Sequence, residues 1–244
     1  MTTDRPRTPV PTSPSFGRTG LLAAIVAAAL VAAPTPGEAQ PSDDGAWLPW
    51  LGCWTATGAA GELLCIRPSE EDRAVELLSL EGGSVTSTET LRADGRPHPV
   101  SREGCEGTES AAFSDDGRRI YLESDLTCEG DVERRSTGIV AWVSPEEWIR
   151  VETVEVGNET AATVERFGPA PSDELEGTEL DDIVAGRSMA VRSARMAAAS
   201  RPSPDAVIEA NREVHDEAVR AWVAERGDPL DVDAATLATM SDAG

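Results

Sequence analysis

The four cysteines of this 244-residue chain restrict its fold more than any other feature, because they fall in two pairs around turn signals. Cys105 and Cys128 flank the segment FSDDGRRIYL, in which the DG dipeptide is a strong signal for a hairpin turn. If the strands beside this turn pair, the two cysteines face each other. Cys53 and Cys65 likewise lie at equal distances on either side of the turn segment TGAAGE, so they too face each other if its strands pair. Facing positions meet the short Cα spacing of a disulfide, so we predict the bridges Cys53–Cys65 and Cys105–Cys128, with the other two connectivities as alternatives.

Residues 1–39 have the composition of an export signal. Three arginines precede an apolar run of 13 residues, LLAAIVAAALVAA, and small residues follow before Gln40. This order is typical of a secretory signal peptide, and 13 residues are fewer than the roughly 20 that span a bilayer. We therefore expect a mature chain that begins near Gln40 and is periplasmic or secreted, where disulfides persist. A retained membrane anchor is the alternative.

The rest of the chain is strongly acidic. Removal of the three arginines and two acids of residues 1–39 changes the formal net charge from −23 to −24. A surface of this charge repels nucleic acid and anionic lipid, so we expect neither nucleic acid nor, after signal cleavage, a membrane as a partner. All 21 basic residues are arginine, and this excludes Schiff-base chemistry by a lysine side chain.

Residues 46–168 have the pattern of an antiparallel β domain. Turn signals such as EGGS, ADGR and CEGD separate short runs rich in Val, Ile, Thr, Leu and Trp. About eight strands at this spacing predict an up-and-down β-barrel or a sandwich. In RRIYLESDLTC, Ile120 and Leu122 alternate with polar residues, which indicates one dry and one wet face. Pro97 and Pro99 place their stretch at a sheet edge or in a loop.

A helical region follows a Pro/Gly/acidic linker at 169–177, which makes the predicted fold class α+β. We predict three short helices within 178–244. They are expected from after Thr178 to Ala199, from the N-cap Ser203 to Gly227, and from Asp231 or Asp233 onward. Each helix has an apolar stripe that must be covered by the other helices, by the β domain or by a partner.

The stretch WLPWLGCW opens the β domain and carries a family resemblance. Gly52-Cys53-Trp54 resembles the GxW at the start of the first strand in lipocalin-like small β-barrels. The resemblance covers this opening strand and the general number of strands. In that family the tryptophan closes one end of the barrel against an arginine from a late strand, a role that the resemblance gives to Arg150 or Arg166. The alternative is that Trp54 is a core tryptophan beside a disulfide.

The two histidines do not suggest a metal centre. His98 lies in a proline-bracketed loop and His215 beside the apolar stripe of the second predicted helix. A zinc site needs three or four ligands at close spacing, and the cysteines are expected in disulfides. The haem barrels that resemble lipocalins use a histidine late in the barrel, and none lies between His98 and His215. We therefore expect no metal and no cofactor.

One acidic residue is distinguished by its predicted position. The register that joins Cys105 to Cys128 puts Glu109 on the inward face with Phe113 and Leu122. A carboxylate inside a barrel binds a ligand or acts as an acid or base, because burial raises its pKa. The alternative is that Glu109 pairs with an arginine or lies at an open rim.

Three functional hypotheses follow. The first is an exported, non-enzymatic barrel that binds a small apolar ligand, with the contacts Trp54, Glu109, Phe113 and Leu122. The second is a structural or protein-interaction module of the cell envelope, whose helical tail docks through an exposed groove of Val207, Val214, Val219 and Trp222. The third is a hydrolase that uses acids such as Glu109.

Overall fold

A computed structural model describes residues 43–58, 62–102, 104–171, 189–229 and 238–239 of the chain. All of them belong to one compact unit, Gln40–Gly244. The expected signal peptide, the start of the first predicted helix and most of the third lie outside the described residues. No helix within the described ranges is long and apolar enough to cross a membrane.

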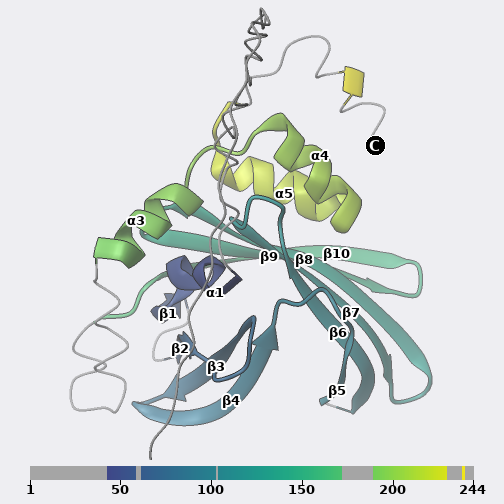
Figure 1. Cartoon of the computed structure of the whole chain (residues 1–244). Coiled ribbons are helices and arrows are strands. Elements are labelled where there is room, and N and C mark those ends of the chain that lie inside the picture. The colour runs from purple at the N-terminus through teal and green to yellow at the C-terminus, as the bar shows by residue number, and fades with distance from the viewer. Residues whose placement is uncertain (1–42, 59–61, 103, 172–188, 230–237, 240–244) are drawn as a thin grey trace, which may run out of the picture. The chain divides into compact units, whose positions relative to one another are not determined.

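One curled antiparallel sheet of ten strands, a half-barrel, forms the body of the protein (Figure 1). Its order is β4-β3-β2-β1-β10-β9-β8-β7-β6-β5, so β4 and β5 are the two edges. The strands are β1 (Gly52–Ala56), β2 (Glu62–Pro68), β3 (Ala74–Glu81), β4 (Ser84–Arg92), β5 (His98–Arg102), β6 (Cys105–Phe113), β7 (Arg119–Cys128), β8 (Val132–Ser144), β9 (Glu147–Val156) and β10 (Glu159–Pro169). The single sheet replaces the sandwich alternative.

The sheet has ten strands instead of the predicted eight or so. Strand β10 has a weak local pattern, since Val164 is its only branched residue besides two threonines. It is extended because it pairs with β1 on one side and β9 on the other, which overrides a weak local preference. The stretch with Pro97 and Pro99 leads into β5, an edge strand, as the prolines predicted.

Both predicted disulfides are confirmed. Cys53 faces Cys65 in the β1–β2 ladder, and Cys105 faces Cys128 in the β6–β7 ladder; both pairs are bridged. The register across the SDDG turn is also as predicted, but the turn is longer than two residues. The Ser114 N–H donates to the Arg119 carbonyl at 3.0 Å, so four residues lie between the last paired positions.

The outer face of β7, β8 and β9 is covered by two helices, α4 (Pro204–Glu213) and α5 (Asp216–Arg226). Apolar side chains from both layers form one buried cluster, which includes Tyr121, Ile139, Ile149, Val151, Val207, Val214, Val219 and Trp222. A third helix, α3 (Met189–Ala198), packs against the short 3-10 helix η1 (Leu48–Trp50) and β8, and a single turn, α1 (Asp43–Ala46), precedes η1. Helices α4 and α5 therefore cover the outer face of the half-barrel, whereas α3 packs at one end of it.

The helix predicted from Ser203 to Gly227 is interrupted. Ser203 is the N-cap as predicted, and its side chain accepts a hydrogen bond from the Ala206 N–H. The chain becomes extended at Val214, and His215 caps α5 by accepting from the Glu217 N–H at 3.2 Å. The His215 N–H donates to the Thr137 hydroxyl of β8 at 3.0 Å and not to a carbonyl of α4. A cap and a contact with the sheet thus split one apolar stripe into two helices.

One arginine is buried between the helices and the sheet. Arg119, 3% exposed, donates to the Tyr121 hydroxyl at 3.3 Å and to the Glu209 carboxylate of α4 at 3.1 Å. Its guanidinium lies 5.3 Å from the ring of Trp222 in α5. Burial raises the pKa of Glu209, although Arg119 and the Asp115 N–H oppose this shift. Arg119 therefore ties one strand to both covering helices.

Tyr121 gives a direct test of this layer, because it is the only tyrosine of the chain. Burial raises its pKa from 10.0 to about 12, although Arg119 opposes the shift. The folded state keeps the phenol proton longer than the unfolded state. Stability is therefore retained below pH 10 and falls by roughly 2 kcal/mol as the pH rises towards 12. Phenolate absorbance should report a midpoint near pH 12 in the folded protein.

The matched variant is Tyr121→Phe, which should lack this loss of stability. The chain contains no lysine and its described cysteines are all in disulfides, so Tyr121 is the side chain expected to titrate between pH 9 and 12. A folded-state midpoint near pH 10 would contradict the burial of Tyr121 under α4 and α5.

Candidate ligand-binding site

Tryptophans fill one end of the half-barrel. The indoles of Trp50 and Trp54 each lie 5.3 Å from Trp142 and 6.0 Å from Trp148. Trp148 also stacks on Phe167 at 3.9 Å. The Trp54 N–H donates to the Trp50 carbonyl at 3.0 Å, which ties the first strand to the 3-10 helix before it. These four indoles are only 1–3% exposed and form one packed cluster at this end.

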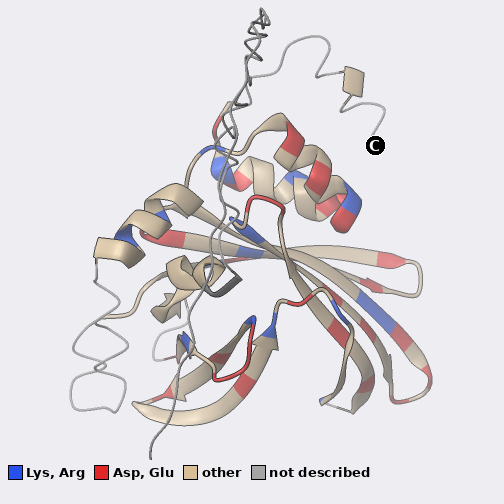
Figure 2. Cartoon of the chain, viewed as in Figure 1, with Lys and Arg blue, Asp and Glu red and all other residues tan. Residues whose placement is uncertain are grey.

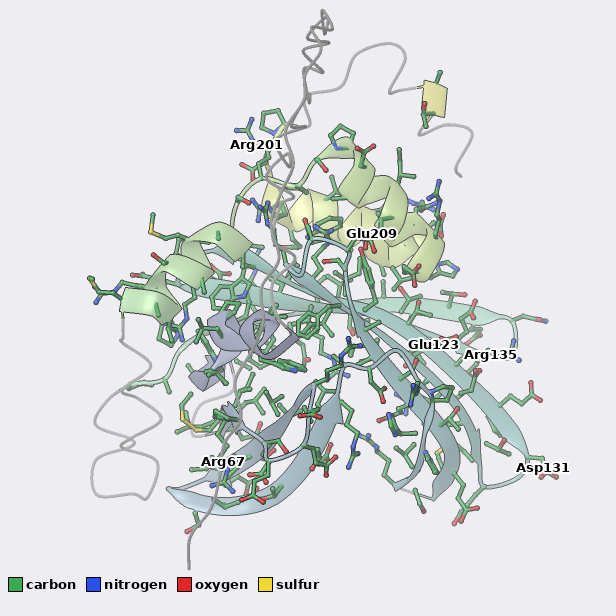
Figure 3. All side chains as sticks on the ribbon, viewed as in Figure 1. Arg67, Glu123, Asp131, Arg135, Arg201 and Glu209 are labelled. Carbon is green, nitrogen blue, oxygen red and sulfur yellow. A yellow bond between two sulfur atoms is a disulfide. The ribbon has the colours of Figure 1, made fainter. Side chains whose placement is uncertain are left out.

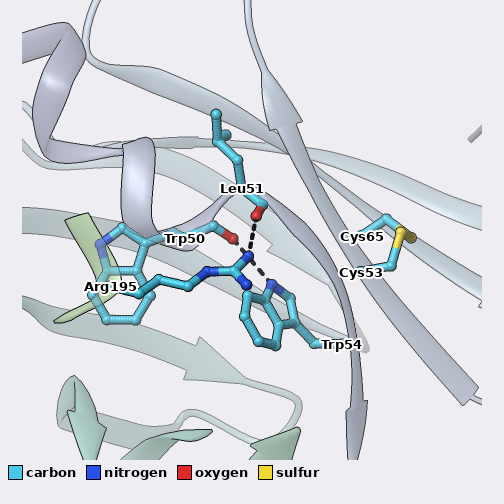
Figure 4. The surroundings of a disulfide bond; sticks show 6 residues. All are labelled: Trp50, Leu51, Cys53, Trp54, Cys65 and Arg195. Carbon is cyan, nitrogen blue, oxygen red and sulfur yellow. Dashed lines mark hydrogen bonds between the residues drawn. A yellow bond between two sulfur atoms is a disulfide. The ribbon is translucent and has the colours of Figure 1, made fainter. Parts of the chain in front are cut away.

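An arginine lies against Trp54, but it comes from helix α3 and not, as the lipocalin-like resemblance had implied, from a late strand. The Arg195 guanidinium lies 4.5 Å from the Trp54 ring (Figure 4). Its Nε donates to the Pro49 carbonyl at 3.0 Å and one terminal nitrogen to the Leu51 carbonyl at 2.7 Å. The charge is thus held by a ring face and two backbone oxygens.

The residues named for this role, Arg150 and Arg166, were the wrong ones. Arg150 pairs with Glu152 at 2.7 Å, and Arg166 pairs with Glu147 and Glu225. The arginine comes from α3, a helix after the last strand, because α3 packs on η1 just before β1. The sequence did contain a signal, because Val191, Arg195 and Ala198 recur at helical spacing and so share one face of the helix. In the structure Val191 and Ala198 are buried on either side of Arg195.

Replacement of Arg195 tests the closed end. Arg195→Ala leaves two carbonyls without donors and removes the contact with Trp54, so the free energy of unfolding should fall by about 2–4 kcal/mol. Arg212→Ala, at an exposed position in the last turn of α4, removes the same charge and should change it by less than about 0.5 kcal/mol. Denaturant unfolding measures both, and equal effects would contradict the role of Arg195.

Beyond the tryptophans the half-barrel is open and contains a cavity of about 750 Å³. Its walls come from β3 to β9, on both sides of the gap between the edge strands. The side chains that line it are a mixture of apolar and polar groups. They include Leu77, Leu91, Val100, Leu122 and Leu126 among the apolar residues, and Arg102, Glu109, Ser124, Arg134, Ser136, Arg150 and Glu152 among the polar ones.

The lining of this cavity is electrically balanced in a protein of net charge −23. Four arginines and four glutamates contribute to it, whereas acidic residues predominate over the chain as a whole (Figure 2). Two of these arginines are engaged within the cavity. Arg102 pairs with Glu109 and lies 3.7 Å from Glu89, and Arg150 pairs with Glu152.

Two guanidinium groups keep donors for another molecule. Arg134 has no carboxylate partner among the residues that the structure describes. Arg150 uses one terminal nitrogen for Glu152, and its side chain is 42% exposed. Beside them, the hydroxyls of Ser124 and Ser136 bond to each other at 2.8 Å. Gly138 follows Ser136 on the same face and has no side chain, and a Cβ there would lie 2.8 Å from the Val151 carbonyl oxygen.

The structure separates the predicted ligand contacts into two groups. Glu109 and Leu122 line the cavity. Trp54 and Phe113 belong to the filled aromatic core instead, and Phe113 packs against Trp47 at 4.8 Å. The cavity arginines were missed, although Arg134, Ser136 and Gly138 alternate along β8 with outward residues.

The exposed groove expected on the helical tail is not formed. Val207, Val214, Val219 and Trp222 are 7%, 6%, 4% and 1% exposed, because they face the outer side of the sheet. Within the described ranges no group of three or more His, Cys, Asp and Glu side chains is arranged to hold a metal. His98 pairs with Asp94 at 3.0 Å, and this bond lowers the Asp94 pKa.

Comparison with known proteins gave no relative by sequence: no family model and no curated protein matches. The solved structures that match include two secretory abundant heat soluble proteins from Ramazzottius varieornatus. Each is 11% identical and covers 50% of this chain and 96% of its own, with TM-scores of 0.33 and 0.31.

Proposed function

We propose that this protein is an exported, non-enzymatic carrier that holds a small amphipathic molecule in the cavity of the half-barrel. The observation that carries the proposal is the cavity of about 750 Å³ beside a fully packed aromatic end. Its volume is within the range of ligand sites in proteins. The polar groups in its lining favour an amphipathic ligand over the purely apolar one predicted from the sequence.

An anionic group on the ligand fits the charges of the cavity. Arg134, with which no described carboxylate pairs, and the exposed part of the Arg150 guanidinium offer N–H donors in the cavity lining. Hydrogen bonds from an arginine to a carboxylate are stronger than those between neutral groups, and more so away from water. The apolar part of the ligand would lie against Leu77, Leu91, Leu122 and Leu126.

Export is supported by the two disulfides, since such bonds persist in oxidising compartments. The interaction module receives less support, because its proposed contacts are buried under the helices. A hydrolase is also less favoured. The Arg102 guanidinium lies beside both Glu109 and Glu89, so these carboxylates form an ion-pair network.

A matched pair of probes tests this function, namely dansyl-labelled undecanoic acid and its methyl ester. Both should enter the cavity and gain fluorescence, but only the acid can pair with Arg134. Arg134→Gln should weaken binding of the acid about 10-fold, the effect of one charge-assisted hydrogen bond. Binding of the ester should change less than about 2-fold.

The adjacent Arg135 provides the control, because it lies on the outer face of β8 (Figure 3). Its side chain is 68% exposed and pairs with Asp125 at 2.9 Å. Arg135→Gln removes the same charge from the protein and should leave binding of both probes unchanged. Failure of the wild-type protein to bind either probe would contradict the carrier function. Equal losses in the two variants would contradict the role of Arg134.

A further inference from the structure

The curled sheet is open along one line, which we call the seam. Strands β4 and β5 follow each other in the chain but do not pair, whereas every other consecutive pair of strands does, and β10 also pairs with β1. The two edges are separated in Figure 1. The residues of β4 from Ser84 to Thr90 are all exposed. The backbone groups along these edges therefore bond to water rather than to a neighbouring strand.

The seam lies directly in front of the cavity. Nine of the cavity-lining residues come from its two edges: Glu89, Thr90, Leu91 and Arg92 of β4, and His98, Pro99, Val100, Ser101 and Arg102 of β5. Separation of the edges would expose the cavity to solvent along its length. No backbone hydrogen bond of the sheet has to break for this movement.

The two ends of the seam are held in different ways. Near the β4–β5 connection, Asp94 forms a backbone bridge with Ala112, and the Gly95 N–H donates to the Ala111 carbonyl at 2.9 Å. At the other end the described contact across the seam is between side chains, Arg102 of β5 and Glu89 of β4, at 3.7 Å. These side chains are 46% and 56% exposed. One end is therefore a hinge and the other is a weak ion pair.

We propose that ligands enter and leave the cavity sideways through the seam, with the Glu89–Arg102 ion pair as its latch. This inference rests on the proposed carrier function. Arg102 also pairs with Glu109 inside the cavity, so it remains held on β5 when Glu89 moves away. An incoming anion meets Arg102 first and then the donors of Arg134 and Arg150.

A variant of the latch should change the rates of binding without changing affinity. Glu89→Gln removes the ion pair across the seam and keeps the pair between Arg102 and Glu109. Stopped-flow fluorescence with dansyl-labelled undecanoic acid should show association and dissociation both about 2-fold faster, the size expected for one exposed ion pair. The dissociation constant should stay within 2-fold. Glu133→Gln, an exposed change on β8 outside the seam, is the control and should alter neither rate.

A covalent latch gives the opposite result. The double variant Glu89→Cys and Arg102→Cys can be joined by a bifunctional thiol reagent, since the described native cysteines are all in disulfides. Joined protein should exchange the probe at least 10-fold more slowly than the same variant before joining. Equal rates would overturn the proposal, because the probe would then pass through the open end beside the β7–β8 and β9–β10 hairpins.

A second readout does not depend on ligand binding. The variant Leu122→Cys introduces a thiol in the cavity lining behind the seam. This thiol should react with a maleimide about 2-fold faster when Leu122→Cys is combined with Glu89→Gln. No acceleration would overturn the seam as the route into the cavity. If the wild-type protein binds no probe but this acceleration is observed, the carrier function fails and the seam stands.

Discussion

The contact between Arg195 and Trp54 closes one end of the half-barrel, and the position of the cavity at the other end follows from it. A guanidinium from a helix after the last strand lies on the indole of the first strand and donates to two carbonyls before it. It thereby fixes the tryptophans at one end, where Trp50, Trp142 and Trp148 fill the interior. The space inside the sheet is then left at the other end only. Closure of one end is what makes a cavity, instead of a flat sheet or a solid core, at the other.

The change from filled to open can be followed along single strands. On the inner face of β8 the residues pass from Trp142 and Val140 to Gly138, Ser136 and Arg134. On β9 they pass from Trp148 to Arg150 and Glu152. The outer faces of the same strands are apolar where α4 and α5 cover them. Successive side chains of a strand point to opposite faces. The inner face of each of these strands therefore lines the tryptophan core at one end and the cavity at the other, and its outer face packs against the helices.

Local patterns predicted much of this fold. The spacing of Cys105 and Cys128 around a DG turn was sufficient for the register, the disulfide and the inward position of Glu109. Ser203 marked a helix start by its capping side chain alone.

The break at His215 depended on Thr137 of a distant strand, so the helical pattern could not indicate it. The partner of Trp54 was missed for the same reason: Arg195 is 141 positions away, and only tertiary packing brings it there. The inward position of Arg134 could be predicted in principle, since alternation along β8 places it on the same face as Ser136. That no described carboxylate pairs with Arg134 could not be predicted.

The central claim is that the open end of this half-barrel binds an amphipathic anion beside Arg134. A crystal structure of the protein with dansyl-labelled undecanoic acid tests it most directly. The account predicts the carboxylate within hydrogen-bond distance of the Arg134 guanidinium, the acyl chain against Leu122 and Leu126, and the tryptophan cluster unchanged. A probe bound outside the half-barrel, with the cavity free of it, would contradict the account.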